Sequence, residues 1–275
     1  MHIILNEKLY VEQLLKQLDG AGADGAGIKL GLSERPAYDL RLMARYFAQE
    51  EHLTPHRIYL RLTEIMENSY NDFSLAAWQS LLLDMAKNAA KRPLIQVDAV
   101  PVTGRELAVI GQIPEKPMRR LAFTLLCLAK YRNLANENNR DWINYAYKDI
   151  FKMANVSATI KEQCLMIRKL CSRGLCRMNR IVDNLSLCIC FVDHECTEAA
   201  AKITDFRNLG YYYLKLTGEA FVQCRRCGIL MKPGKRNNKK YCDSCAPLAN
   251  VQKQRLRDQK RQLQSSNYAA AASSS

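Results

Sequence analysis

The feature that most constrains this chain is a pair of Cys-x-x-Cys motifs near its C-terminal end. The four cysteines are Cys224, Cys227, Cys242 and Cys245, with 14 residues between the two pairs. Zinc in structural sites takes four ligands in a tetrahedron, and each motif can supply two thiolates to one ion. The gap is slightly shorter than the roughly 15 to 20 residues of the commonest such spacing. We therefore expect a small module built on one structural Zn²⁺.

The alternative is four unrelated reduced thiols. It is disfavoured because the segment is short, punctuated by Gly228 and poor in apolar residues, so that metal binding would have to supply much of its folding free energy. An all-thiolate set leaves no open position for water or substrate, which favours a structural over a catalytic metal. Iron also accepts four thiolates, but zinc suits a sequence with no other redox motif.

This C-terminal module is strongly basic. Residues 221–275 contain 12 Lys or Arg and 2 Asp, a formal charge of +10, whereas residues 1–220 carry only +4 of the total +14. Such a module predicts binding to a phosphate backbone, which is strong, blind to sequence and weakened by salt. A solvated basic tail is the alternative. The candidate phosphate-binding residues are Arg225, Arg226, Lys235, Arg236, Lys239, Lys240, Lys253, Arg255, Arg257, Lys260 and Arg261.

The residues after the last cysteine pair, 246–264, favour a mostly polar helix. In a treble-clef arrangement the last ligand pair opens such a helix. Its few apolar residues do not form a full stripe, so we expect it to lie in solvent or along a polyanion. The final residues, 265–275, are of low complexity and are expected to be disordered.

The rest of the composition indicates a globular protein of the cytoplasm. The N-terminus lacks the pattern of an export signal, and the longest apolar run is far shorter than the roughly 20 residues of a membrane span. Seven further cysteines lie mostly within apolar patterns, where reduced thiols act as small hydrophobic groups. We expect no disulfide framework and no membrane partner.

The N-terminal region predicts a helical domain, residues 1–104. A glycine-rich loop at 19–27 is followed by helical periodicity near 36–50, 55–68 and 73–90, with Ile58, Leu62, Ile65 and Met66 placed toward a core. Two short apolar segments at 94–100 and 106–113 fit either two strands or a strand and a short helix. The pattern does not separate these two readings.

The middle region, 105–220, predicts a winged helix-turn-helix. An apolar helix, a second amphipathic helix and a short break precede Thr159-x-x-Glu162, a capping box that should start a third helix. Ile160, Cys164, Ile167 and Cys171 would form its core stripe, and Gly174 would end it. A hairpin should follow, turning at Asp183 and Asn184, with Leu185, Leu187, Ile189 and Phe191 alternating onto one face. Such a unit places its third helix in the DNA major groove.

The outer face of that third helix carries the candidate base-reading residues. Arg and Lys can read guanine, and Gln can read adenine. Charges opposite an apolar stripe are also what any surface helix shows, and the partly outward Leu165 and Met166 would suit a protein partner equally well. The candidates are Lys161, Gln163, Arg168, Lys169 and Arg173.

Several segments carry a resemblance to a known group of proteins. They are LAFTLLCLAK, DWINYAYKDIFKMANVS, the VDN turn, ITDFRNLGYYYL, and CRRCG followed by KKYCDSC, within residues 105–245. The chain resembles uncharacterised proteins of bacteriophages and mobile elements of Gram-positive bacteria, which pair a winged-helix-like segment with a C-terminal zinc ribbon. The resemblance implies architecture, and it supplies no catalytic residue.

No pattern of an enzyme is present. The four histidines are scattered, and P-loop, nucleophile-elbow and His-Glu-x-x-His motifs are absent. We expect a mainly α protein with short β hairpins: a helical domain, a winged helix and, over 221–264, a treble-clef-like zinc ribbon with a basic helix. The expected function is non-catalytic binding of double-stranded DNA, as a transcriptional regulator or a replication accessory factor. The alternatives are an adaptor that docks a host protein, and an RNA-binding protein.

Overall fold

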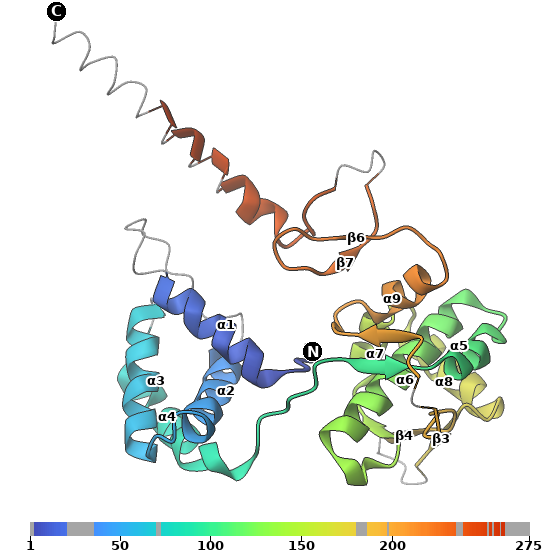
Figure 1. The fold of residues 1–275 in the computed structure, drawn as a ribbon, viewed down its shortest axis with the longest axis horizontal. Helices are drawn as coiled ribbons and strands as arrows, with labels where there is room; N and C mark the ends of the chain where they lie inside the picture. Colours follow the sequence, from blue (N-terminus) through green and yellow to red (C-terminus); the bar gives the residue numbers. More distant parts are fainter. Residues whose placement is uncertain are drawn as a thin grey trace, which may run out of the picture. The chain divides into compact units, whose positions relative to one another are not determined.

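The computed structural model describes residues 3–20, 36–69, 73–179, 186–196, 198–234, 239–251, 253–254, 256–258 and 260–261. The chain is mainly helical with small antiparallel sheets, as the sequence predicts (Figure 1). It forms two compact units. The N-terminal unit comprises Ile3–Val100 and Asn133–Asn138, and the C-terminal unit holds Pro101–Arg132 and the described chain from Asn139 onward. Within the described residues, no helix combines the length and apolarity needed to cross a membrane.

The N-terminal unit is a group of helices around an apolar core. Its helices are α1 (Glu7–Gly20), α2 (Pro36–Gln49), α3 (Pro55–Ser69), α4 (Leu75–Asn88) and the 3₁₀ turn η1 (Ala89–Lys91). The helices predicted near 36–50, 55–68 and 73–90 are therefore confirmed. Pro at the first helical position explains the starts of α2 and α3, because its fixed φ suits a helix and its missing N–H has no partner there. The predicted glycine loop, 19–27, is wrong at its first two residues, which still belong to α1, and its residues 21–27 lie outside the described residues.

The core of this unit is where the periodicity placed it. Ile58, Leu62 and Met66 are buried, whereas Ile65 is only partly buried against them. The extended segment after η1 returns along the start of the chain: the Glu7 amide donates to the Ile95 carbonyl at 2.8 Å. The Glu7 carboxylate accepts from the Ile95 amide and from Arg45 of α2.

The C-terminal unit begins with a strand and a helix. The strand is β1 (Val100–Val102) and the helix is α5 (Gly104–Gly111), which decides between the two readings left open for 94–113. Thr103 starts α5 through a capping box with Glu106, the same pattern that the sequence shows at Thr159 and Glu162. β1 pairs with β5 (Ala201–Ile203).

The middle of this unit surrounds α6 (Lys116–Ala135), which is buried along most of its length because nearly all of its residues from Leu121 to Ala129 are small or apolar. After the turn η2 (Glu137–Asn139) follow β2 (Trp142–Asn144), α7 (Tyr147–Met153), α8 (Ile160–Ser172), β3 (Cys176–Met178) and β4 (Ser186–Ile189). The three strands form an antiparallel sheet of order β2-β4-β3. The sequence predicted the hairpin of β3 and β4, but not β2.

The start and end of α8 follow the sequence prediction, but its apolar stripe does not. Thr159 and Glu162 form the capping box, and Gly174 takes φ +73° after the helix. Ile160, expected in the core, is 80% exposed. It occupies the first helical position of α8, whereas the buried part of the helix lies further along, at Ile167 and Leu170. The predicted hairpin turn at Asp183 and Asn184, with Leu185, lies outside the described residues.

The chain then leads to the cysteine module. Helix α9 (Leu209–Leu216) packs on α6 through Tyr213, whose ring centroid lies 5.5 Å from that of Phe123. Strands β6 (Val222–Gln223) and β7 (Leu230–Met231) form a small antiparallel hairpin. The described residues of 246–251, 253–254, 256–258 and 260–261 are helical and are called the C-terminal helix below. The predicted disordered tail, 265–275, lies outside the described residues.

Candidate metal centre and basic cleft

The four predicted ligands come together. The sulfur atoms of Cys224, Cys227, Cys242 and Cys245 all lie within 4.8 Å of one another, close enough to converge on a single ion. Cys224 and Cys245 are buried, whereas Cys227 and Cys242 are partly exposed. Among the described residues this is the only cluster of three or more His, Cys, Asp or Glu side chains with such convergence. A four-thiolate set fits zinc and, by ligand type alone, also iron.

Two local structures present the thiols. The first pair sits at the turn of the β6-β7 hairpin, where the Cys224 amide donates to the Ile229 carbonyl at 3.0 Å. Gly228 takes φ +72° in this turn. This conformation is less favourable for residues that have a Cβ atom than for glycine. The second pair lies at the start of the C-terminal helix, where the amides of Cys245 and Ala246 both donate to the Cys242 carbonyl.

Backbone amides also act on the sulfur atoms. Burial raises the pKa of the Cys224 thiol, but amide donors from Cys227, Cys242 and Arg226 outweigh it and hold that pKa at about 6. Burial and the neighbouring thiols raise the pKa of Cys245 to about 12. In the absence of a cation Cys224 thus favours the thiolate, whereas Cys245 favours the thiol. A bound divalent ion favours the thiolate at all four positions.

The module is attached to α9 by two side chains that the sequence analysis did not single out. Arg207 makes a bidentate pair with Asp205 and donates to the Cys227 carbonyl at 2.6 Å. Asn208 donates to the Leu230 carbonyl of β7 at 2.7 Å. The only sequence signal was the motif ITDFRNLGYYYL, whose polar centre sits between apolar residues.

Asn208 extends this attachment toward α8. Its side-chain oxygen accepts from Asn155 at 2.9 Å, and the Asn155 oxygen accepts from the Tyr211 amide. Asn155 lies between α7 and α8 with φ +54°, which an Asn tolerates better than most residues. A continuous set of hydrogen bonds therefore links the α7–α8 turn, α9 and the cysteine module.

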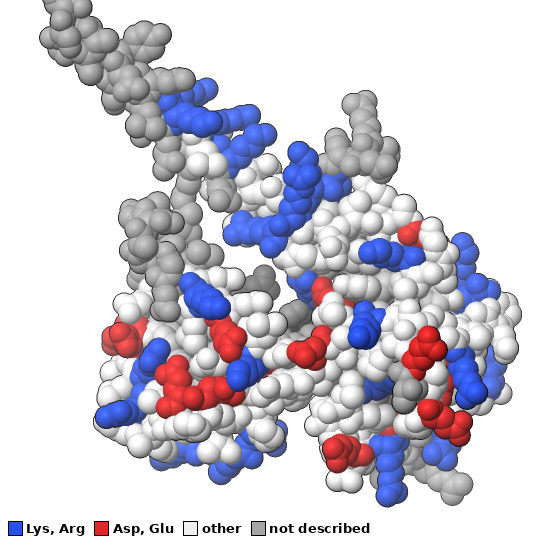
Figure 2. All heavy atoms as spheres, viewed as in Figure 1, with Lys and Arg blue, Asp and Glu red and all other residues white. Residues whose placement is uncertain are grey.

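A basic cleft lies beside the cysteines. Its volume is about 630 Å³, and it opens between the cysteine module and the C-terminal helix. The space-filling view shows Lys and Arg side chains gathered over this part of the chain, with few acidic groups among them (Figure 2). The cleft is lined by Arg225, Arg226, Lys240, Tyr241, Ala249, Asn250, Lys253 and Leu256.

Other predicted phosphate-binding residues lie outside this cleft. Lys239 pairs with Asp243 at 2.9 Å, which raises the pKa of the lysine and reduces its availability. Arg257, Lys260 and Arg261 are exposed on the C-terminal helix. Lys235, Arg236 and Arg255 fall outside the described side chains.

The predicted base-reading residues of α8 differ in availability. Lys161, Arg168 and Lys169 are exposed. Arg173 instead forms an ion pair with Glu115 at 3.1 Å. The side-chain amide of Gln163 donates to the Ala158 carbonyl at 3.0 Å.

An apolar cleft of about 330 Å³ runs along α8. Leu165, which is 54% exposed, and the partly exposed Met166 line it, as the sequence indicated for these two side chains. Its rim is of mixed charge, with Glu115, Glu162, Arg120 and Lys169.

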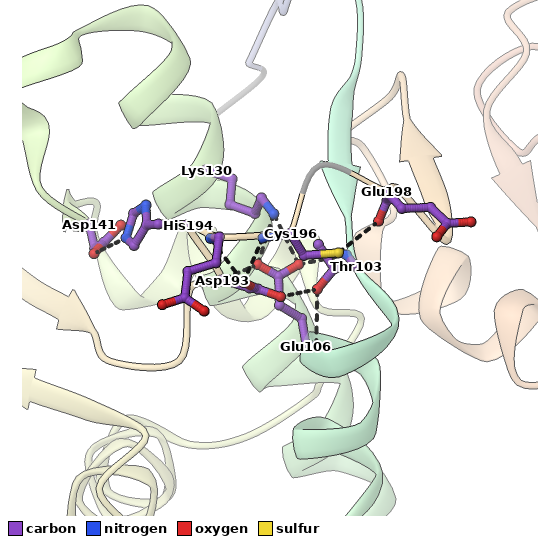
Figure 3. Close-up of polar contacts among 9 residues, drawn as sticks. Thr103, Glu106, Lys130, Asp141, Asp193, His194, Cys196 and Glu198 are labelled. Carbon is purple, nitrogen blue, oxygen red and sulfur yellow. Dashed lines mark hydrogen bonds and ion pairs between the residues drawn. The ribbon is translucent and has the colours of Figure 1, made fainter.

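A buried ion pair lies elsewhere in the C-terminal unit. Lys130 of α6 donates to both oxygens of Glu106, at 2.8 and 3.0 Å, and Glu106 also accepts from the amides of Thr103 and Asp193 (Figure 3). Both charges are satisfied, so the network fits a structural role in joining α5, α6 and the segment after β4. The pattern Thr103-x-x-Glu106 was visible in the sequence as a capping box, but its burial was not.

Among the residues that the structure describes, the histidine and cysteines near this network do not form a second metal cluster. His194 is exposed and meets Asp141 at 3.0 Å, whereas the Cys196 thiol contacts the Glu198 carbonyl (Figure 3). Cys188 is buried in β4, and Cys190, just after that strand, is exposed.

Comparison with models of protein families, with curated proteins and with solved structures finds no match to this chain.

Proposed function

We propose that this protein is a non-catalytic DNA-binding protein whose C-terminal module is held together by zinc. The observation that carries the proposal is the cleft beside the clustered cysteines, which four cationic side chains line. Arg225, Arg226, Lys240 and Lys253 all line it, and no acidic residue does among the side chains that the structure describes. Cations so arranged fit the phosphates of a nucleic-acid backbone.

The element order around α6 supports a winged helix-turn-helix as the second DNA-contacting part. Helix, strand, two helices and a two-stranded hairpin follow one another, and β2 joins the hairpin in the order β2-β4-β3. In this reading α8 is the recognition helix and Lys161, Arg168 and Lys169 are its available cations. Arg173 and Gln163 contribute less, because both already have protein partners.

The hydrogen bonds through Asn155 and Asn208 support joint action of the two parts. They fix the α7–α8 turn to the hairpin of the cysteine module, so that one duplex could meet α8 and the module in a set geometry. In this proposal α8 selects sequence and the basic module supplies affinity. A regulator or a replication factor of a phage or other mobile element would use both.

The cysteine cluster would hold Zn²⁺ as a structural ion. All four donors are thiolates, and two of them are buried, which leaves no position for a substrate. The β6-β7 hairpin has two-residue strands and few apolar residues behind it, so the metal would supply the folding free energy of a zinc ribbon.

The test is selection from a random double-stranded DNA pool by zinc-loaded protein at low and near-physiological salt. An enriched motif that persists at the higher salt supports sequence-specific binding. Arg225→Ala with Arg226→Ala should weaken binding to all sequences, whereas Lys161→Ala with Arg168→Ala should relax the motif. Lys87→Ala with Lys91→Ala, two exposed lysines of the N-terminal unit, removes equal charge and serves as the control. Absence of binding to any nucleic acid at low salt contradicts the proposal.

One observation favours a second candidate, an adaptor that docks a protein. The apolar cleft beside Leu165 and Met166 occupies the face of α8 that would otherwise enter DNA. In that case Leu165→Lys abolishes complex formation with the partner, whereas the Arg225 and Arg226 substitutions leave it intact.

A further inference from the structure

The basic cleft beside the cysteines is lined by two large apolar side chains in addition to its cations. Tyr241 lies on the cysteine-module side, immediately before Cys242, and Leu256 lies on the C-terminal helix. We propose that this cleft takes one unpaired nucleotide of a DNA or RNA strand, with the phosphate on the cations and the base between Tyr241 and Leu256. The inference rests on the proposed function, which it deepens by naming the ligand of the cysteine module.

The cleft is built on fixed backbone rather than on surface side chains alone. The Arg225 amide donates to the Lys240 carbonyl at 2.9 Å, which joins the segments that carry Arg226 and Tyr241. The opposite wall starts from the second cysteine pair, because the amides of Ala246 and Ala249 donate to the carbonyls of Cys242 and Cys245. Both walls therefore extend directly from the metal centre.

Size and chemistry argue for a nucleotide rather than a bare phosphate. The volume of about 630 Å³ lies within the range of small-ligand sites, roughly 300 to 1,000 Å³. A phosphate alone would contact only the cations. It would bury no apolar surface of Tyr241 or Leu256. Leu256 is 54% exposed on a helix that is otherwise mostly polar, and a planar base would cover it. Tyr241 supplies the aromatic ring on which bases stack without regard to sequence.

A paired base cannot use this site. In a duplex both faces of each base are covered by its neighbours, and proteins reach only the base edges in the grooves. Contact with the face of a base requires a single strand or a nucleotide turned out of the helix. The cleft therefore predicts a preference for unpaired nucleotides, a preference that phosphate contacts alone would not produce.

The experiment measures fluorescence anisotropy of the full zinc-loaded chain with four labelled probes of equal length: a DNA duplex, its single strand, the same strand without bases, and the RNA equivalent. Tyr241→Leu removes the ring, and Tyr241→Phe keeps it. Leu256→Ala shortens the opposite wall, and Leu248→Ala is its matched control. Leu248 is 52% exposed on the same helix and does not line the cleft. Zinc content per chain checks that each variant keeps its module.

We expect the base-containing single strands to bind more tightly than the abasic strand by roughly 5- to 100-fold at equal salt. Tyr241→Leu should remove that difference and leave the abasic affinity unchanged. Tyr241→Phe should stay within about twofold of the parent. Leu256→Ala should lower the affinity for base-containing strands only, and Leu248→Ala should leave the affinity for every probe unchanged. Comparison of the single-stranded DNA probe with its RNA equivalent shows which of the two nucleic acids the site prefers.

Equal affinity for base-containing and abasic strands overturns the inference. So does a loss of affinity in Tyr241→Leu that is the same for every probe. If the duplex still binds in either case, the proposed function stands and only the nucleotide site fails. If none of the probes binds, the proposed function itself fails.

Discussion

At the scale of single residues, the same sequence pattern has different consequences according to where the fold places it. Thr103 and Thr159 both begin helices through a capping box with the Glu three residues later. Thr103 is only 2% exposed and also contacts Asp193, whereas Thr159 is exposed. The local hydrogen bonds are alike, but the consequence of losing them is not.

We therefore expect Thr103→Ala to reduce the free energy of unfolding by about 2 kcal/mol and Thr159→Ala by about 1 kcal/mol or less. The first leaves buried polar partners without a bond, whereas the second returns its partners to water. Urea unfolding in a Trp78→Phe background measures this, because Trp142 is then the one tryptophan left and reports on the C-terminal unit. Equal losses for the two variants would contradict the argument.

The thiols outside the metal centre should react in the order of their burial. Burial raises the pKa of Cys127 and of Cys176, and both are almost inaccessible. Cys190 is exposed, although its pKa is raised too. At about pH 8, alkylation of the native protein should reach Cys190 first and the other two last, and the rate should rise with pH as thiolate forms. Peptide mass spectrometry after timed quenching tests this order. Early labelling of Cys127 would show that α6 is not the buried helix described here.

At the scale of elements, α9 is positioned by a close backbone approach. A Cβ atom added to Gly210 would lie 1.9 Å from the carbonyl oxygen of Ala154, which follows α7. Only glycine allows this contact, and the contact brings Asn208 within reach of both Asn155 and β7. The small element α9 thereby sets the position of the cysteine module on the rest of its unit.

Gly210→Ala should destabilise the C-terminal unit by about 1–3 kcal/mol, because backbone must move to admit the methyl group. Gly111→Ala is the matched control: it lies at the end of α5 with nothing within 4 Å of an added Cβ. That change should be neutral or stabilise by about 0.5 kcal/mol. Trp142 fluorescence in urea provides the comparison. Comparable destabilisation by both changes would remove the case for a special approach at Gly210.

At the scale of the whole molecule, the chain combines two kinds of stability. The units around α2 and α6 have apolar cores of their own. Among the described residues, the apolar cluster of the cysteine module is small: Cys224, Met231 and Cys245 are its buried members, with a few partly buried neighbours. We therefore expect most of its order to come from a bound metal and from the contacts of Arg207 and Asn208.

Chelation of the metal from zinc-loaded protein should remove hydrogen-exchange protection from residues 222–234 and 239–251 and leave α6 protected. Cys224→Ser should reproduce this effect, whereas Cys190→Ser, outside the cluster, should not. Low pH should act like the chelator, since protons compete with the metal for the thiolates. Unchanged protection after complete metal removal would mean that the module folds without an ion.

The sequence by itself determined the features that depend on local spacing. Periodicity predicted α2, α3 and α4, the capping pattern set the start of α8, and two Cys-x-x-Cys pairs identified the four cysteines that converge, because each is a property of neighbouring residues. Tertiary structure alone decided the rest. It left Ile160 in solvent, paired the short strand β2 with β4, buried Glu106 with Lys130, and brought Tyr241 and Leu256 to the same basic cleft. Each of these depends on contacts between distant segments, whose free energies have no counterpart in local sequence pattern.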